Sequence, residues 1–316
     1  MHFSVIIPLY NGRSHIARTL RSVLGQSHAD FELIVVDDGS DDGSAEIVDA
    51  FDDSRIRLVR QRNSGASAAC NKGLELARHE WLAFLNADDL WLSNHLEELQ
   101  RVITRCPKAG MVANDTAQLT TQSPLPRLDT RQRAPMYIDY FMSASKRIGI
   151  IHRSAVCLSR YLLDAVGGFR NHRYGADLEM WARAALHSPV ALSSKVTVVY
   201  YTQTGVAIDS MQSTQSQQNA KQYAYTLDAI SPSVSALAAF LQTHPDSPLN
   251  DGIRAYINSR IDNSIKSRLF HLELASARHE ARLYLRPLGA KNLALRAGVL
   301  IPAALLRPAL RAYLRK

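Results

Sequence analysis

The amino-acid sequence predicts an α/β fold with a mostly parallel sheet in residues 1–210, followed by a helical region in residues 211–316. Two observations carry this prediction. Up to about residue 201, short apolar runs rich in β-branched residues alternate with amphipathic helical patterns, an order that is typical of parallel strands joined by helices. Beyond that point the strand patterns end and long helical patterns follow. A chain of 316 residues has room for one large domain and a smaller appendage.

The elements of the first part follow one another in a regular order. Each helix is marked by apolar residues three and four positions apart, and each strand by a compact apolar run between turn residues. Strands are predicted at residues 3–8, 31–36, 56–59, 82–85, 111–113, 154–158 and 196–201. Helices are predicted at 14–24, 44–51, from the polar loop at 63–67 to residue 77, at 90–103, at 162–169 and from residue 177 onward. Residues 120–135, with three prolines, are predicted to form either a loop that covers a substrate or a variable surface insertion.

Each of the first four predicted strands is followed by polar residues. The carboxyl ends of parallel strands lie on one edge of a sheet, and open α/β sheets bind their ligands at that edge. We therefore expect these polar side chains to lie together and to form a ligand site. They are Tyr10, Asn11, Asp37, Asp38, Asn63, Asn86, Asp88 and Asp89.

The last of these strand ends carries two adjacent acids, Asp88 and Asp89. Neighbouring carboxylates repel each other, and a divalent cation bridging a carboxylate to phosphate groups would supply the counter-charge. The alternative is a solvated loop in which one of the two acids caps the helix at 90–103. The four coinciding polar strand ends favour the ligand site. The glycines match neither the dinucleotide fingerprint nor the phosphate-binding loop of P-loop proteins, which excludes those two kinds of nucleotide site.

Four segments carry a family resemblance. They are Ser4-Val-Ile-Ile-Pro-Leu-Tyr-Asn11, Val35-Val-Asp-Asp-Gly-Ser40, Asn63-Ser-Gly-Ala-Ser-Ala-Ala-Cys-Asn-Lys-Gly73 and Phe84-Leu-Asn-Ala-Asp-Asp89. In this order and spacing, the sequence from about residue 3 to residue 205 resembles the family 2 glycosyltransferases with the GT-A fold. The resemblance implies an inverting glycosyltransferase. Such an enzyme would move a sugar from a nucleotide-diphospho-sugar, a UDP-sugar first of all, to a hydroxyl of a lipid-linked saccharide acceptor. The product would be a surface polysaccharide such as O-antigen, capsule or exopolysaccharide.

The resemblance also implies a donor site. Asp37 would bind a ring nitrogen of the base, and Asp88 would ligate Mg²⁺ or Mn²⁺ between the two phosphates. Asn86 stands where an aspartate is commoner. Cys70 stands where many relatives carry an arginine, so that one phosphate or sugar contact is missing or comes from elsewhere; a small buried helix residue is the alternative for Cys70. The implied nucleotide-binding residues are Pro8, Tyr10, Asp37, Asp38, Asn63, Asn86 and Ala87.

Asp177 is the candidate catalytic base. It lies at the start of a predicted helix, where the helix dipole favours an ionised carboxylate. The segment resembles the family's Glu-Asp motif, whose aspartate takes the proton of the acceptor hydroxyl, with Ala176 in place of the glutamate. A helix cap is the alternative for Asp177. His172 and Arg173 are predicted to touch the acceptor or to belong to a solvated loop. The Arg or His that often follows the last strand in relatives is absent after Tyr201.

The net charge of +8 belongs wholly to the C-terminal part. Residues 246–316 hold thirteen basic and five acidic residues, and residues 286–316 hold seven basic residues, many apolar ones and no acid. A basic amphipathic tail of this kind is predicted to lie on an anionic membrane surface. The alternative is a helix packed on the protein or on a partner. No aromatic stacking platform interleaves with these charges, so nucleic acid is not an expected partner.

The cysteines and the N-terminal residues indicate the cellular compartment. Three widely spaced cysteines predict neither a disulfide framework nor a zinc site, which is typical of a reducing compartment. Residues 1–4 lead straight into a strand, so no signal peptide is expected, and no apolar run reaches the length of a membrane span. We expect a cytoplasmic protein, peripheral on the inner face of the cell membrane, and leave a homodimer open.

Two other functions compete with sugar transfer. A sugar nucleotidyltransferase would make the nucleotide-sugar, but it usually needs a glycine-rich basic loop after the first strand, where residues 9–13 offer only Arg13. A non-catalytic nucleotide-binding scaffold at the membrane would account for the departures at Cys70 and Ala176. The presence of both Asp88 and Asp177 favours the enzyme.

Overall fold

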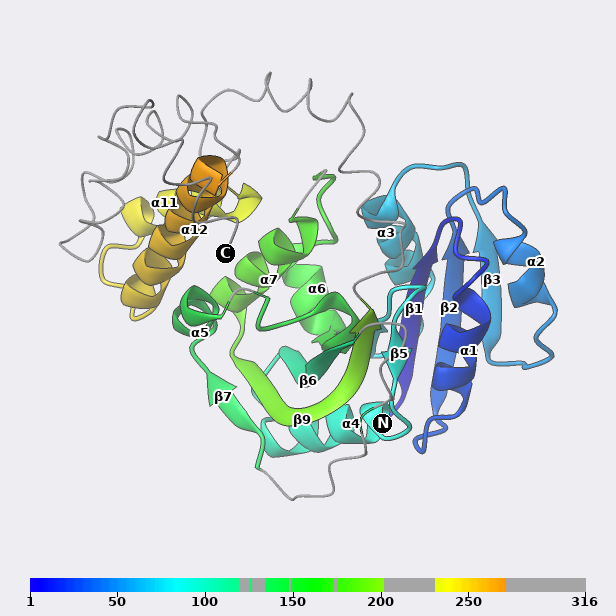
Figure 1. The fold of residues 1–316 in the computed structure, drawn as a ribbon. Coiled ribbons are helices and arrows are strands. Elements are labelled where there is room, and N and C mark those ends of the chain that lie inside the picture. The colour runs from blue at the N-terminus through cyan, green and yellow to red at the C-terminus, as the bar shows by residue number, and fades with distance from the viewer. Residues whose placement is uncertain (120–125, 127–133, 148, 173–174, 202–230, 271–316) are drawn as a thin grey trace. The chain divides into compact units, whose positions relative to one another are not determined.

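A computed structural model describes residues 1–119, 126, 134–147, 149–172, 175–201 and 231–270 of the chain. The chain divides into two compact units, Met1–Tyr140 with Gly149–Met211 and Phe141–Ile148 with Gln212–Lys316, which are described separately below (Figure 1). Arg173 and the predicted membrane-binding tail at 286–316 lie outside the described residues. The domain boundary predicted at residue 210 stays a prediction.

The first unit is built on a parallel sheet that continues into antiparallel strands. Its parallel part has the order β3-β2-β1-β4, with the strands β1 (Phe3–Leu9), β2 (Phe31–Asp37), β3 (Ile56–Arg60) and β4 (Trp81–Phe84). Beyond β4 the order continues through β8 (Val156–Ser159), β6 (Met111–Leu119), β9 (Val190–Tyr201) and β5 (Leu90–Trp91), and β7 (Met136–Ile138) pairs with β9. The predicted α/β class with its mostly parallel, helix-flanked sheet is confirmed.

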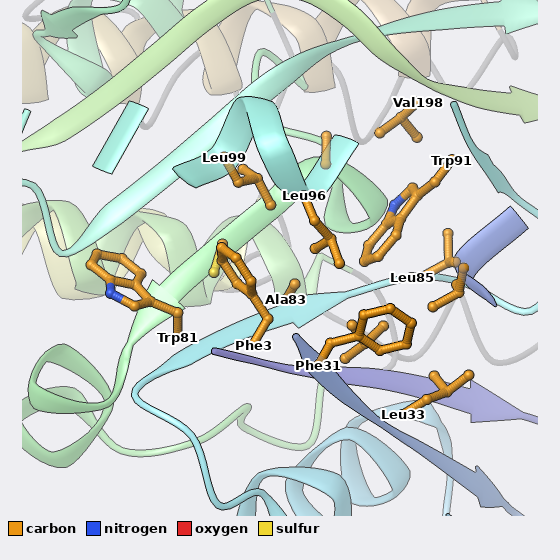
Figure 2. Packing of buried hydrophobic residues seen from close by; sticks show 14 of the residues in the cluster. Phe3, Phe31, Leu33, Trp81, Ala83, Leu85, Trp91, Leu96, Leu99 and Val198 are labelled. Atoms are coloured by element: carbon orange, nitrogen blue, oxygen red, sulfur yellow. The ribbon is translucent and has the colours of Figure 1, made fainter. Parts of the chain in front are cut away.

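Helices cover both faces of this sheet. They are α1 (Ile16–Leu24), α2 (Ser44–Asp49), α3 (Ala66–Leu76), α4 (His95–Arg105), α6 (Arg160–Val166) and α7 (Ala176–His187). Because side chains alternate along a strand, β1 sends Phe3, Val5 and Ile7 to one face, where they share a buried cluster with α1, α2 and α4. Figure 2 shows Leu96 and Leu99 of α4 directed towards Phe3 and the strands of this cluster. Full burial of each such side chain stabilises the fold by about 1.5–3 kcal/mol.

The opposite face of the parallel strands packs against α3 and α7. Gly73 of α3 lies so close to β1 that a Cβ atom there would come within 2.4 Å of Ile6 Cγ2, which explains the glycine. The ring of Phe84 at the end of β4 contacts Trp181 of α7, with ring centroids 6.4 Å apart. These contacts hold α3 against β1 and α7 against the end of β4.

Two details of the predicted elements are wrong. The helix predicted at 90–103 begins only at His95, because the buried residues Leu90 and Trp91 pair with Val199 and Val198 as strand β5. The residue before α4 is Asn94, so neither Asp88 nor Asp89 caps this helix. Strand β8 runs antiparallel to β4 and to β6 within the mostly parallel sheet that the sequence predicts.

The second unit is helical where it is described. It contains α11 (Pro232–Thr243), α12 (Asn250–Phe270) and most of α5 (Tyr140–Lys146). The Tyr256 ring packs edge-on against Phe141 at 5.9 Å. Along α12, three isoleucines spaced by four residues are buried, namely Ile253, Ile257 and Ile261. Among the described residues, no helix has both the length and the apolar character needed to cross a membrane.

Glu32 of β2 is buried and ties the chain leading into β4 to the sheet. Its carboxylate accepts hydrogen bonds from Ser4 Oγ at 2.7 Å and from the backbone N–H and Nε of Arg78 at 2.7 and 3.0 Å. Burial would raise the pKa of Glu32, but the hydrogen bonds from Arg78 and Ser4 outweigh it and hold the pKa below the ordinary value of 4.5. The carboxylate therefore stabilises the fold when it is ionised.

We expect Glu32→Gln to lower the free energy of unfolding at neutral pH by roughly 1–3 kcal/mol. Because the folded pKa is depressed, the wild-type advantage is complete above the unfolded pKa and is lost as the pH falls through the folded pKa. Urea denaturation of both proteins between about pH 7 and pH 3 measures this convergence. Glu80→Gln, at an exposed position, is the matched control. Parallel stability curves for the wild type and Glu32→Gln would contradict this role.

Candidate active site

The loops after β1 and β2 are bonded to each other at the carboxyl edge of the sheet. The backbone N–H of Asn11 donates to Ser40 Oγ at 3.0 Å, and Asn11 Oδ1 accepts from the N–H of Asp41 at 3.1 Å. Asn11 adopts a positive φ of 48°, which asparagine tolerates better than most residues. The Tyr10 side chain is 48% exposed beside this pair of loops, and Pro8 precedes it on β1. The predicted meeting of polar strand ends on one edge is thus observed for these two strands.

Asp37 and Asp38 end β2 and are both only 3% exposed. The Asp38 carboxylate accepts hydrogen bonds from the backbone N–H groups of Ser64 and Gly65 and from Gln61 Nε2, each at 2.8 Å. Asp38 therefore holds the loop that carries the predicted nucleotide residue Asn63, which is itself exposed. Asp37 Oδ1 accepts a longer bond of 3.3 Å from the N–H of Ser40. The nucleotide contacts of these residues stay predictions.

The loop from Asn86 to Asp89 is fixed from within. Asn86 Nδ2 and the hydroxyl of Ser154 both donate to Asp89 Oδ2, and the backbone N–H of Asn86 donates to Ser154 Oγ at 3.1 Å. Burial, together with the neighbouring Asp88 carboxylate, raises the pKa of Asp89 to about 7. The amide of Asn86 thus gives Asp89 a donor that an ionised aspartate at position 86 would lack. Asp89 is engaged inside the loop, whereas Asp88 is only half-buried.

Helix α1 also holds this loop in place. The buried hydroxyl of Thr19 donates to the carbonyl oxygens of Ala87 and Asp89 at 2.8 and 2.9 Å. Arg18 Nη2 donates to the carbonyl oxygen of Asp88 at 3.1 Å, and its guanidinium lies 4.3 Å from the ring centre of Tyr201. The backbone around Asp88 is therefore held by side chains from a different element, which favours a defined orientation of its carboxylate.

The donor atoms near Asp88 fit a divalent cation that is completed by a substrate. No group of three or more His, Cys, Asp and Glu residues in the described part of the chain is arranged to hold a metal alone. Mg²⁺ commonly binds through one or two carboxylates together with the phosphates of its substrate, and carboxylate oxygens also suit Mn²⁺. Asp88 provides the carboxylate and Asn86 an amide oxygen at the same strand end. These two residues are the ones that would hold the metal.

Asp177 lies in the first turn of α7. The residue before the helix is Gly175 with a φ of 70°, and no side chain caps this end, so the structural alternative of Asp177 as the helix cap is wrong. Asp177 Oδ1 accepts from the backbone N–H of Leu178 at 2.9 Å. The next acid, Glu179, is buried and forms ion pairs with Arg170 and Arg183 at 3.1 and 2.8 Å. Glu179 therefore anchors α7, and the catalytic role of Asp177 stays a prediction.

His152 is a site residue that sequence analysis missed. Its ring stacks on Tyr200 with centroids 4.7 Å apart, and its Nδ1 lies 3.9 Å from Asp89 Oδ2. Burial lowers the pKa of His152, while the nearby carboxylates of Asp177 and Asp88 act to raise it. The contact with Asp89 therefore places His152 beside the loop that carries Asp88.

The antiparallel direction of β8 explains why His152 was missed. Ala83 pairs with Cys157 and Trp81 with Ser159, so the beginning of β8 lies beside the carboxyl end of β4. The turn η1 (Arg153–Ala155) before β8 is thereby brought to the edge that carries Asp88. A His-Arg pair directly before a buried strand is the only signal in the sequence, and it has this meaning only once the strand direction is known.

The predicted acceptor residues are less completely placed. The backbone N–H of His172 donates to the carbonyl oxygen of Arg170 at 2.9 Å, and His172 Nε2 is buried without a hydrogen-bond partner among the described residues. Arg173 lies outside them. The acceptor contacts of His172 and Arg173 stay predictions.

Two curated relatives match the first part of the chain. The putative teichuronic acid biosynthesis glycosyltransferase TuaG of Bacillus subtilis is 47% identical over 98 residues, which cover 30% of this chain and 39% of TuaG. The UDP-Glc:alpha-D-GlcNAc-diphosphoundecaprenol beta-1,3-glucosyltransferase WfgD of Escherichia coli is 42% identical over 95 residues, which cover 30% of this chain and 38% of WfgD. The matched part thus spans about two fifths of the length of these relatives.

Solved structures share the fold. Residues 1–349 of TarS from S. aureus, in complex with UDP-GlcNAc, align with a TM-score of 0.64 and 16% identity over 95% of this chain and 80% of that one. The mannosyltransferase PcManGT from Pyrobaculum calidifontis, in complex with GDP-Man and Mn²⁺, aligns with a TM-score of 0.57 and 18% identity over 100% of this chain and 81% of that one. Identities this low show the fold alone.

The family itself is shown by sequence. The model of the family described as "Glycosyl transferase family 2" matches residues 4–166, more than half of the chain. This range contains all four segments on which the resemblance rests, together with the Asp88 loop and the turn at His152. The resemblance stated from the sequence is confirmed, and the chain belongs to glycosyl transferase family 2.

Proposed function

We propose that this protein is an inverting glycosyltransferase that moves a sugar from a nucleotide-diphospho-sugar, UDP-linked first of all, to a hydroxyl of a lipid-linked saccharide. The observation that carries this proposal is the placement of two elements at the carboxyl end of β4. One is the Asp88 loop, which is fixed by Thr19 and Arg18. The other is α7, whose Trp181 contacts Phe84 of β4 and whose first turn carries Asp177. Asp88 is a half-buried carboxylate on a fixed loop, and Asp177 is a second acid on a separate helix. Sugar transfer needs one group that binds the diphosphate and one that accepts a proton.

The residues divide these tasks as follows. Asp177 accepts the proton of the acceptor hydroxyl as its oxygen attacks the anomeric carbon. The loops tied together by Asn11 and Asp38 hold the base and ribose, while Thr19 and Arg18 hold the Asp88 loop in position. Asp88 and Asn86 would hold a divalent cation, which would supply positive charge for the leaving diphosphate. Attack from the side opposite the leaving group inverts the anomeric configuration.

The names of the relatives support a surface polysaccharide as the product. TuaG is named for teichuronic acid biosynthesis, and WfgD for a glucosyl transfer to a sugar carried on diphosphoundecaprenol. A lipid-linked acceptor agrees with the basic, apolar composition of residues 286–316, which we propose binds the inner face of the membrane. The homodimer stays open.

Product analysis tests this proposal. The protein is incubated with Mn²⁺, a panel of UDP- and GDP-sugars and a synthetic saccharide linked through a diphosphate to a long alkyl chain. Proton NMR then reads the configuration of the new glycosidic bond, which we expect to be β from an α-linked donor, with one nucleoside diphosphate released per sugar. Retention of configuration would contradict the single-displacement mechanism. Pyrophosphate release from a nucleoside triphosphate and a sugar 1-phosphate would identify a nucleotidyltransferase instead.

A further inference from the structure

Arg153 is a partly buried cation without a counter-ion in the described part of the chain. Its Nε is buried and has no hydrogen-bond partner there. No described carboxylate forms an ion pair with it, although the Asp89 carboxylate is near enough to act on its charge. A buried polar group that lacks a partner costs free energy, and in native proteins such a group usually has a functional reason. The neighbours of Arg153 indicate its function.

The residue after Arg153 is hydrogen-bonded to the loop that carries Asp88. Ser154, the next residue, donates its hydroxyl hydrogen bond to Asp89 and accepts one from the N–H of Asn86. The carbonyl oxygen of Ser154 accepts from the indole N–H of Trp91 at 2.6 Å. The turn that carries Arg153 is therefore fixed directly to the segment that carries Asp88.

The side chain of Arg153 is packed towards the helix that carries the proposed base. Its guanidinium carbon lies 5.8 Å from the ring centre of Phe169, at a distance typical of a cation–π contact. The Phe169 ring packs edge-on against Trp181 at 5.8 Å, one helical turn after Asp177. The side chain of Asn71 in α3 fixes the backbone of Phe169 by two hydrogen bonds of 2.8 Å. Asn71 Nδ2 donates to the carbonyl oxygen of Phe169, and Asn71 Oδ1 accepts from its N–H.

The charges around Cys70 agree with this placement. Burial raises the pKa of the Cys70 thiol in α3, and both the Arg153 guanidinium and the Asp177 carboxylate are near enough to modify that shift. Cys70 itself, a buried thiol, brings no charge to the site, and Arg153 brings a positive one from a different segment of the chain.

We propose that Arg153 binds the diphosphate of the sugar donor at the phosphate that is bonded to the sugar. This inference rests on the proposed glycosyltransferase function. In the transfer, the bond between the anomeric carbon and the phosphate oxygen breaks, and its electron pair stays on that oxygen. The acceptor oxygen forms the new bond and its proton passes to Asp177. The N–H groups of Arg153 hydrogen-bond to the leaving oxygens, which a planar guanidinium can do in pairs, and stabilise the charge that develops there.

Nucleotides with one and two phosphates distinguish this role from a structural one. We would titrate the wild type, Arg153→Ala and Arg153→Lys with UDP, UMP, GDP and GMP in Mn²⁺ by calorimetry. For the diphosphate that the wild type binds, we expect Arg153→Ala to weaken binding by about 10- to 100-fold, with binding of the monophosphate unchanged. Arg153→Lys keeps the charge without the paired donors, so we expect its affinity for the diphosphate to lie between those of the wild type and Arg153→Ala. Arg105→Ala, an exposed arginine of α4, is the matched control and is expected to bind like the wild type.

Two results would overturn the assignment of Arg153 to the phosphate. Unchanged diphosphate affinity in Arg153→Ala would overturn the assignment of Arg153 to the phosphate. An equal loss of diphosphate and monophosphate affinity would also overturn it, because it would mean that the substitution disturbs the site as a whole. If the wild type binds none of these nucleotides and neither dTDP nor CMP, the proposed function itself is wrong and the inference falls with it.

Discussion

Replacing Asp177 by asparagine is expected to lower kcat for sugar transfer by roughly 10²- to 10⁴-fold, because the acceptor hydroxyl then has no group to take its proton. Asparagine keeps the size of the side chain and can still accept the hydrogen bond from the N–H of Leu178. The packing of α7 depends on Glu179 and Arg183 rather than on Asp177. We therefore expect an unchanged fold and an unchanged affinity for the donor nucleotide.

Initial rates with saturating donor measure kcat, and calorimetric titration measures the affinity for the donor nucleotide. Asp164→Asn, at an exposed position of α6, is the matched control and is expected to keep the wild-type rate. Full activity in Asp177→Asn would show that another group is the base. A parallel loss of nucleotide binding would show that Asp177 belongs to the donor site instead.

Replacing Asp88 by alanine is expected to abolish metal-dependent binding of the nucleoside diphosphate, with a loss of affinity of more than about 100-fold. This expectation follows because even residues that only orient metal ligands cost about 10- to 100-fold when removed. The backbone of the Asp88 loop is held by Thr19 and Arg18 of α1, so the loop is expected to keep its shape without the carboxylate.

Calorimetric titration of the diphosphate at several Mn²⁺ concentrations measures this loss. Asp52→Ala, an exposed aspartate before β3, controls for the change in net charge. Binding that is insensitive to Mn²⁺ in both the wild type and Asp88→Ala would mean that no metal is involved and that the assignment of Asp88 as a metal ligand is wrong.

The sequence predicts the parallel part of the fold because its signals are local. Apolar runs such as 82–85 are compact, and the polar residues that follow them need only the common direction of the strands to be placed on one edge. The meeting of Asn11 with Ser40 and of Asp38 with Ser64 follows from that direction. The order and spacing of the four motif segments indicated the family.

The rest of the site depends on pairings that no local pattern encodes. The turn at His152 and Arg153 reaches the Asp88 loop because β8 inserts antiparallel between β4 and β6. The hydrogen bond from Ser154 to Asp89 joins residues that are far apart in the sequence. Likewise, Leu90 and Trp91 look like the start of a helix until β9 pairs with them. Burial and the hydrogen-bond partners of Asp89, not its residue type, separate its role from that of Asp88.

Calorimetric titration of the wild-type protein with UDP, GDP, dTDP and CMP, each with and without Mn²⁺, tests the central claim that the carboxyl edge of this sheet is a donor-nucleotide site. The account predicts that one nucleoside diphosphate binds, that Mn²⁺ strengthens its binding, and that UDP is the first candidate. The absence of binding for all four nucleotides, with and without Mn²⁺, would contradict the claim and would favour a scaffold that retains the fold without the chemistry.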